Sequence, residues 1–266
     1  MKKFLLIPLG ILLWMTLSVH TAAEPSNISH QWGFRKSSNG QPADAGSLYE
    51  GMLKEHGAVY KGDPAKKDIY LTFDNGYENG YTTKILAVLK KHKVPAAFFV
   101  TGHYLESASD ITKQMVKEGH IVGNHSWSHP DMTQVTDVQI EQELTKVKEE
   151  TARLTGQKSM VYLRPPRGIF SERTMAAAKN LGYTHVFWSL AYVDWYVDRQ
   201  RGPQFAHEQV MKQIHPGAIL LLHTISKDNA EALESIIVDL KKQGYQFKSL
   251  DDLMKVKMQD SSKKKQ

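Results

Sequence analysis

The chain has 266 residues, of which 41% are hydrophobic and 23% charged, a balance typical of a globular protein. It contains no cysteine, which excludes disulfides, thiolate nucleophiles and cysteine-bound metals. The net charge of +6 lies at the ends: the first 23 residues hold two lysines, and residues 255–266 hold five lysines against one aspartate. The body is therefore neutral and gives no indication of nucleic-acid binding.

Both ends are predicted to lie outside the folded domain. Lys2 and Lys3 precede a mostly apolar run that ends in small residues near position 23, which indicates a secretory signal over residues 1–23. The alternative is a permanent membrane anchor, although the run is short for a span of about 20 residues. We predict that residues 255–266 form a disordered basic tail, with attraction to an anionic wall or membrane surface as the alternative.

The middle of the chain alternates between apolar runs and amphipathic segments. Residues 24–66 lack a sustained period and are predicted to form an irregular N-terminal arm. Strands are expected at 68–74, 96–101, 120–124, 161–163, 184–189, 218–222 and 246–249. Helices are expected near 80–92, 108–118, 137–155, 171–181, 203–214 and 229–243, with a last short helix after the final strand.

Near-continuous apolar strands that alternate with helices indicate a parallel sheet buried on both faces. We therefore predict an α/β protein, an irregular (β/α) barrel of about seven parallel strands over residues 67–254, with an open doubly wound sheet as the alternative. No glycine-rich phosphate loop follows the first strand, which disfavours nucleotide binding.

Groups that can bind metal or transfer protons follow several of these strands. A core needs no such groups, and burying them unpaired costs several kcal/mol each, about 2–7 by transfer scales. In a parallel α/β protein the ends of successive strands form the active site. The candidates are Asp74, Asn75, His125, His129, Arg164, Asp194 and His223.

His125 and His129 are the strongest local signal. If they share one helical turn, both imidazoles face one cation. Imidazole suits Zn, Co and Ni, and added oxygen ligands extend the choice toward Mn. The alternative is a pair of exposed or hydrogen-bonded histidines. Asp74, at a strand end, is either a metal ligand or base, or a turn former beside Asn75 and a glycine.

The remaining candidates each have a structural alternative. The two prolines of the segment 164–168 stiffen that loop, so it presents Arg164 and Arg167 in fixed positions or merely exposes an arginine. Asp194 beside Trp195 pairs a carboxylate with a flat apolar wall, or is simply a surface Asp next to a core Trp. His223 ends an apolar run and has an ordinary pKa near neutrality, so it is a natural proton donor if it faces the site.

Taken together, the motifs T-F-D-N-G, H-S-W-S-H, R-P-P-R-G, V-D-W and L-L-L-H resemble, in this order, those of the polysaccharide deacetylases, carbohydrate esterase family 4 with its NodB-homology domain. The resemblance covers residues 66–254. Residues 31–34, 72–80 and 223–230 further resemble the delta-lactam-biosynthetic de-N-acetylases, which act on muramic acid of peptidoglycan in spore-forming bacteria.

The resemblance implies a role for each candidate. His125 and His129 hold a divalent metal, Zn first, with Mn, Co, Ni or Mg as alternatives. Asp74 is the general base and His223 the general acid, while Arg164 and Asp194 tune them. The pocket for the sugar and the acetyl methyl is formed by residues of the stiff loop and of two other segments: Pro165, Arg167, Gly168, Trp195 and Leu221.

One position departs from the family pattern. The family has a second Asp that binds the metal, and here Asn75 stands in its place. An amide oxygen is a neutral and weaker ligand, so we expect weaker metal affinity or a shell completed by substrate.

The predicted signal indicates export to the cell envelope or the extracellular space, with the forespore surface as one candidate location, and we expect a monomeric hydrolase. It would remove acetyl groups from N-acetylmuramic acid in peptidoglycan strands, leading toward muramic delta-lactam in spore cortex, without nucleic-acid or stable protein partners. The alternatives are an N-acetylglucosamine or chitin deacetylase, an esterase acting on xylan, and a non-catalytic glycan-binding barrel, which Asn75 keeps open.

Overall fold

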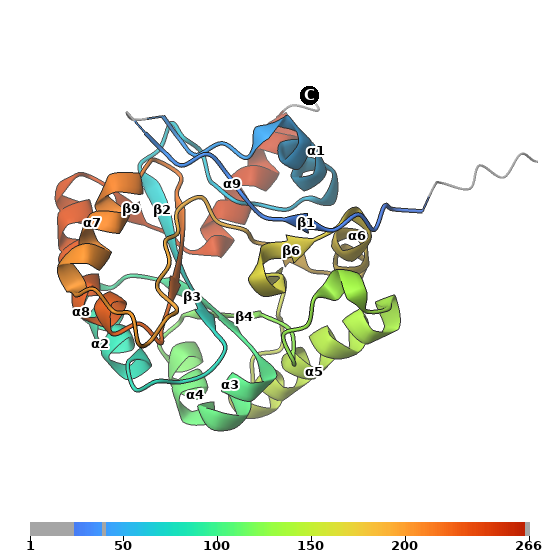
Figure 1. Ribbon diagram of the computed structural model, residues 1–266, viewed down its shortest axis with the longest axis horizontal. Helices are drawn as coiled ribbons and strands as arrows, with labels where there is room; N and C mark the ends of the chain where they lie inside the picture. The colour runs from blue at the N-terminus through green and yellow to red at the C-terminus, as the bar shows by residue number, and fades with distance from the viewer. Residues whose placement is uncertain (1–23, 39–40, 264–266) are drawn as a thin grey trace, which may run out of the picture.

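The computed structural model describes residues 24–38 and 41–263, so the predicted signal lies outside the described residues. Its main sheet is parallel and curls into a half-barrel, with strand order β7-β5-β4-β3-β2-β8 and β9 paired with β2 (Figure 1). The strands are β2 (Asp68–Asn75), β3 (Ala96–Val100), β4 (Ile121–Asn124), β5 (Tyr162–Leu163), β7 (Thr184–His185), β8 (Ile219–His223) and β9 (Gln246–Phe247). The predicted irregular parallel barrel is confirmed.

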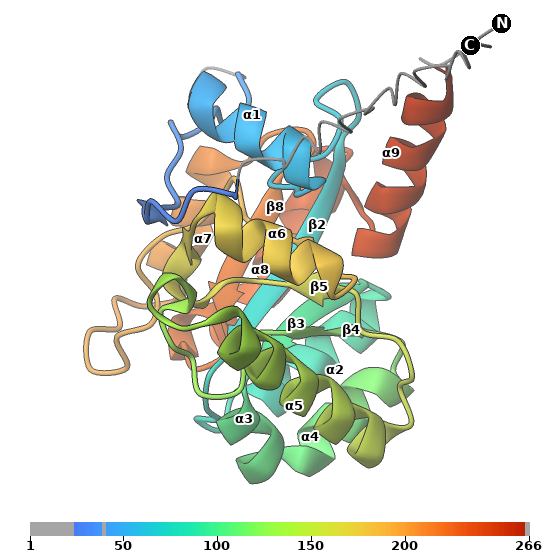
Figure 2. The same ribbon diagram turned by 90° about the vertical axis from the view of Figure 1, so that its right-hand side faces the viewer.

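Helices surround the sheet on its outer side (Figures 1 and 2). They are α2 (Thr82–His92), α3 (Gly102–Ser107), α4 (Ser109–Lys117), α5 (Asp137–Thr155), α6 (Glu172–Asn180), α7 (Pro203–Gln213) and α8 (Lys227–Lys242). Short 3-10 turns lie at η1 (Met132–Gln134) and η2 (Pro166–Gly168). Helix α5 begins with a capping box between Thr136 and Gln139, which holds its first turn.

The predicted strand at 184–189 is wrong beyond residue 185. After β7 the chain crosses from one edge of the sheet to the other: the Val186 amide donates to Leu163 on β5, and the Ser189 amide donates to Ile219 on β8. This crossing partly closes the gap between the sheet edges. It satisfies the backbone groups that a continued strand would have left unpaired.

Alternation along each strand decides which side chains enter the barrel. In β2, Ile69, Leu71 and Phe73 pack toward the helices, so Thr72 and Asp74 point inward. In β8, Leu220 and Leu222 pack outward in the same way, while Leu221 and His223 line the cavity at the end of the barrel. One strand pattern thus produces both a dry outer core and a polar inner mouth.

The N-terminal arm is more ordered than predicted. It contains the helix α1 (Gly46–His56) and the strand β1 (His30–Gln31), which pairs antiparallel with β6 (Ile169–Phe170). Trp32 anchors it: its ring stacks on Phe187 at 4.5 Å, and its indole N–H donates to the Trp188 carbonyl at 3.0 Å. The helix was missed because its stability comes from burial against this aromatic cluster rather than from a local apolar period.

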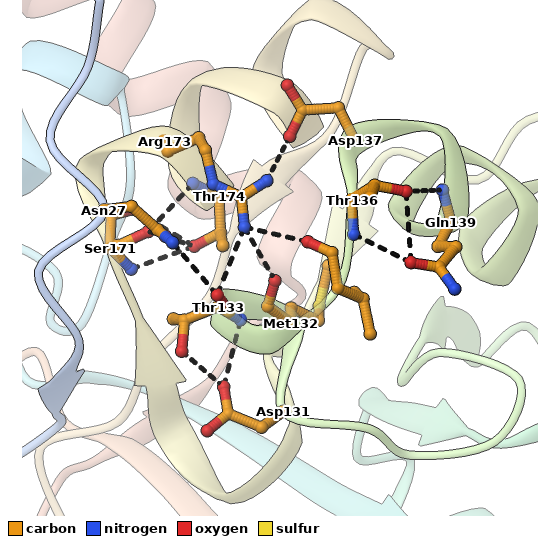
Figure 3. Close-up of polar contacts among 11 residues, drawn as sticks. Asn27, Asp131, Met132, Thr133, Thr136, Asp137, Gln139, Ser171, Arg173 and Thr174 are labelled. Carbon is orange, nitrogen blue, oxygen red and sulfur yellow. Dashed lines mark hydrogen bonds and ion pairs between the residues drawn. The ribbon is translucent and has the colours of Figure 1, made fainter.

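A polar cluster ties the start of the arm to the loop that leaves the site (Figure 3). The Asn27 amide donates to the Thr133 carbonyl at 3.0 Å, and the Ser171 hydroxyl donates to Asn27 at 2.9 Å. Arg173 donates to the carbonyl groups of η1 and Val135 and pairs with Asp137 at the start of α5. These contacts fix the segment that follows the two candidate histidines.

The C-terminal segment corrects a second prediction. Helix α9 (Leu250–Lys263) extends through most of the expected disordered tail, so disorder is wrong for residues 255–263. Leu250 and Leu253 pack against Tyr70 and Ile219, near the beginnings of β2 and β8, and therefore cover the end of the barrel opposite the cavity. Among the helices of the described residues, none combines the length and apolar character needed to cross a bilayer.

Candidate active site

A cavity of about 770 Å³ opens at the carboxyl ends of the strands. Four of the seven predicted metal-binding and proton-transfer residues line it together: Asp74, His125, His129 and His223. They come from the ends of β2 and β8 and from the loop after β4, and the parallel register places Asp74 on β2 directly beside His223 on β8. The sheet alone therefore brings a carboxylate and an imidazole to the same mouth.

Asp74 is held by a buried arginine. The Arg164 guanidinium donates to Asp74 Oδ1 at 2.8 Å and to the Thr72 hydroxyl at 2.9 Å, and it lies over the Phe99 ring at 4.3 Å. Burial, the largest single influence, would raise the pKa of Asp74, but the charges of Arg164, His125 and His223 together outweigh it, and the pKa is lowered. Asp74 is therefore an anion that can accept a proton. Arg164 is buried and does not line the cavity, so it acts on the reaction only through Asp74.

His125 and His129 come together, but not on a helical turn as predicted. Both Ser126 and His129 have a positive φ, near 60°, and the left-handed bends fold the loop until the two rings lie 4.8 Å apart. Such conformations cost roughly 1–3 kcal/mol each, and in proteins they cluster at functional sites. Two hydrogen bonds of Ser126 hold the loop in this conformation. The Ser126 amide donates to Asn124 Oδ1, and the Ser126 hydroxyl accepts from the His129 amide.

The two imidazoles suit a metal ion. His125 Nδ1 lies 2.8 Å from the Arg164 carbonyl, so Nδ1 carries the proton and Nε2 is left as a free donor of electrons, 3.6 Å from Asp74 Oδ2. Burial, followed by the charge of His125, lowers the pKa of His129 to about 4, so this ring is neutral near pH 7. Both rings are thus in the protonation state that a metal ligand needs.

Asn75 stands apart from this pair. It follows Asp74 as the last residue of β2 and does not line the cavity. Its Nδ2 donates to Thr224 Oγ1 at 2.8 Å, while its buried Oδ1 has no hydrogen-bond partner. Among the described residues, no group of three His, Cys, Asp or Glu side chains is placed to hold a metal. Further ligands must therefore be oxygens from water, substrate or this amide.

The proton donor is supported by a second carboxylate. His223 Nδ1 lies 2.7 Å from Asp194 Oδ1, and the His223 amide donates to Asp194 Oδ2 at 2.8 Å. Burial, the largest single influence, would lower the pKa of His223, but the charge and the hydrogen bond of Asp194, together with the charge of Asp74, outweigh it, and the pKa is raised. Asn229, which the sequence analysis did not identify, donates to Asp194 at 2.5 Å and fixes its orientation.

The loop after β5 forms one wall of the cavity. Arg167 and Gly168 line it together with Trp195 and Leu221, whereas Pro165 does not and instead begins the turn with φ of −69°. Arg167 itself has a positive φ of 57° and its carbonyl accepts the Gln31 side chain at 2.6 Å. A side chain at Gly168 would come within 2.8 Å of Trp188, so glycine is needed there.

Several lining residues were not predicted from sequence. Gln31 belongs to the arm, which carried no chemical signal, and Trp188 lies on the segment predicted as a strand. Tyr77, in the loop after Asp74, and Trp127, between the two histidines, had only their positions beside predicted ligands to identify them. His103 also lines the cavity, where it is exposed.

Comparison with known proteins identifies this arrangement. The sequence profile described as "Polysaccharide deacetylase" matches residues 61–186. The peptidoglycan-N-acetylmuramic acid deacetylase PdaA of Bacillus subtilis is 55% identical over 231 residues, covering 87% of this chain and 86% of PdaA. The chain belongs to the polysaccharide deacetylase family.

Solved structures of polysaccharide deacetylases agree with this fold. The structure of Bacillus subtilis PdaA, a family 4 carbohydrate esterase, matches with a TM-score of 0.86 and 54% identity, covering 87% of this chain and 99% of that one. A family 4 carbohydrate esterase of Bacillus anthracis matches with a TM-score of 0.75 and 56% identity, covering 88% of this chain and 99% of that one. A pseudoenzyme of the same family from Bacillus anthracis matches with a TM-score of 0.69 and 33% identity, covering 74% of this chain and 68% of that one.

Proposed function

We propose that this polysaccharide deacetylase hydrolyses the N-acetyl group of N-acetylmuramic acid residues in peptidoglycan. The observation that carries the proposal is the pairing of two oppositely tuned groups at one mouth. Asp74, whose pKa is lowered, is paired with Arg164, and His223, whose pKa is raised, is paired with Asp194. Two titratable groups whose surroundings push their pKa values in opposite directions form an acid–base pair. The similarity to PdaA supports the choice of substrate.

In this proposal Asp74 accepts a proton from a water molecule, whose oxygen attacks the acetyl carbonyl carbon. The C–N bond breaks, and His223 donates its proton to the departing amine, leaving acetate and a free amino sugar. Arg164 keeps Asp74 ionised and oriented, while Asp194 holds Nδ1 of His223 so that Nε2 faces the cavity. A divalent metal, Zn first, with His125 and His129 as its ligands, would polarise the reacting oxygen atoms.

Arg167 is the residue we propose for substrate choice. N-acetylmuramic acid carries a lactyl carboxylate, and the Arg167 guanidinium on the cavity wall offers paired N–H donors to such a group. We expect Arg167→Ala to lose more activity on peptide-free muramyl glycan than on chito-oligomers, by about tenfold. Equal losses on the two substrates would remove Arg167 from this role.

Acetate release with mass spectrometry of the glycan fragments tests the function itself. The parent protein is expected to replace acetyl by hydrogen on muramic acid, and Asp74→Asn to abolish the change. Asp110→Asn, whose side chain is 91% exposed, is the matched control and should behave as the parent. Loss of acetyl from glucosamine alone would favour the N-acetylglucosamine or chitin alternative.

A non-catalytic glycan-binding barrel is the second candidate, because a family pseudoenzyme shares this fold and Asn75 departs from the metal-binding pattern. Binding of muramyl strands without acetate release, whichever divalent metal is added, would support this second candidate. We further propose that the protein is an exported monomer of the cell envelope or forespore surface whose product leads toward muramic delta-lactam. Cell fractionation of a sporulating culture tests this location.

A further inference from the structure

A second cavity of about 690 Å³ adjoins the catalytic one. The two share Trp188, Trp195 and Leu221 as walls. Both volumes lie within the range of roughly 300–1,000 Å³ that is usual for small-molecule sites. A linear polymer that occupies the catalytic cavity can therefore continue past Trp195, whose side chain is 43% exposed, into the adjoining cavity.

The adjoining cavity is built by segments outside the family match at residues 61–186. Phe34 and Lys36 come from the N-terminal arm, and the loop 191–201 supplies most of the opposite wall. Figure 2 shows this loop projecting beside α7. It exposes large apolar side chains, Tyr196 at 44% among them, an arrangement that soluble proteins keep chiefly at binding surfaces.

Unpaired positive charge faces the adjoining cavity. Lys36, Arg199 and Arg201 line it, and within the described part of the chain none of the three forms an ion pair. The Arg199 guanidinium lies 4.8 Å from the centre of the Tyr196 ring, which holds it at the rim. Positive charge is therefore available to a ligand rather than neutralised within the protein.

The acidic residues of this cavity are already engaged. Asp194 is bound to His223 and Asn229, and Asp228 accepts the backbone amides of Arg201 and Gly202 at 2.6 and 2.8 Å. Both carboxylates therefore have hydrogen-bond partners within the protein. Aromatic faces beside free cations suit a sugar that bears a carboxylate.

We propose that the adjoining cavity is a second glycan subsite, in which Lys36 and Arg199 bind a carboxylate carried by the strand outside the reacting sugar. This rests on the proposed function, because it takes the ligand to be a muramyl strand. The carboxylate belongs either to a second lactyl group or to a stem peptide, and the two sources are distinguished below.

The test is calorimetric binding in a His223→Gln background, which avoids heat from turnover. A peptide-free muramyl hexasaccharide is compared with a neutral chito-hexaose. Adding Lys36→Ala and Arg199→Ala should weaken muramyl binding about fivefold to tenfold, as expected for two accessible ion pairs, and leave chito-hexaose binding unchanged. The exposed lysines of α5 and α7 provide the matched control, Lys148→Ala with Lys212→Ala, which should change neither affinity.

Equal affinities with and without the two substitutions, for peptide-free and peptide-bearing muramyl strands alike and in protein whose thermal unfolding is unchanged, overturn the subsite. A larger loss with peptide-bearing strands assigns the carboxylate to the stem peptide, and equal losses assign it to the lactyl group. Acetate release by the parent protein is measured separately. If no muramyl strand releases acetate, the proposed function fails while a binding difference still establishes the subsite.

Discussion

At the scale of single residues, the proton donor depends on its carboxylate partner. If His223 must be protonated to act, activity falls as the pH rises through its raised pKa. Asp194→Asn removes the largest of the charges that oppose the effect of burial, so the pKa of His223 falls and the alkaline limb of the kcat profile moves to lower pH. We expect kcat near neutrality to fall by roughly a hundredfold or more.

A pH profile of acetate release checks this expectation. Asp198→Asn is the control. Asp198 is an exposed carboxylate on the same loop, so its substitution removes the same charge and leaves the hydrogen bond between Asp194 and His223 in place. A variant Asp194→Asn that is fully folded and keeps the alkaline limb of the parent would contradict the role given to Asp194.

Asn75 stands where the family pattern has a metal-binding aspartate. Asn75→Asp places a buried anion at the end of β2, directly after Asp74, and one of its oxygens can accept a hydrogen bond from the Thr224 hydroxyl, which now accepts one from the Asn75 amide. Because ligand charge governs affinity for hard and borderline cations, we expect Zn²⁺ to bind about tenfold to a hundredfold more tightly. Calorimetric titration measures this, and parent and variant affinities that coincide would contradict it.

At the scale of secondary-structure elements, the arm is held chiefly by one side chain. Trp32 is 5% exposed and contacts residues of the arm, of the loop after β5 and of the segment after β7. Trp32→Ala should lower the free energy of unfolding by about 3–5 kcal/mol, the usual cost of removing a buried aromatic ring. Urea unfolding measures it.

Trp195→Ala is the matched control for this change. It deletes the same ring where it is 43% exposed, and such surface changes usually stay within about 0.5 kcal/mol. A Trp32→Ala protein no less stable than Trp195→Ala would mean that the arm does not depend on Trp32.

The elements that sequence reasoning located are those with strong local patterns. The strands β2 and β8 are apolar runs whose ends carry Asp74 and His223, and both were placed almost to the residue. Helix α1 and the strand β1 were missed, because their stability comes from contacts with segments more than a hundred residues away. The local sequence pattern of these segments does not indicate such long-range contacts.

The candidate site shows the same division. Its reacting groups follow strands and could be placed from sequence, whereas Asn229, which orients Asp194, looks like an ordinary residue of the first turn of a helix. The histidine loop was placed correctly but given the wrong shape, since left-handed Ser126 and His129 have no signature that separates them from a helical turn. Supporting contacts require the tertiary fold.

At the scale of the whole molecule, buried neutral imidazoles govern stability in acid. His185 is 2% exposed, its ring is stacked against Phe187, and its Nε2 has no hydrogen-bond partner. Burial lowers its pKa from 6.5 to about 3. The unfolded chain takes up this proton below about pH 6.5, whereas the folded protein does not until about pH 3. The stabilisation is therefore complete above pH 6.5 and is lost as the pH falls toward 3.

His185→Leu removes this dependence while keeping an apolar side chain of similar volume. At about 1.4 kcal/mol per pH unit, the parent should lose roughly 3 kcal/mol more than the variant between pH 6.5 and pH 4. Urea unfolding across this range measures the difference, and His103→Leu, which removes an exposed imidazole, should keep the slope of the parent. Parallel curves for the parent and His185→Leu would mean that the buried ring is protonated in the folded protein, and that burial in the barrel wall does not set the acid limit of the fold.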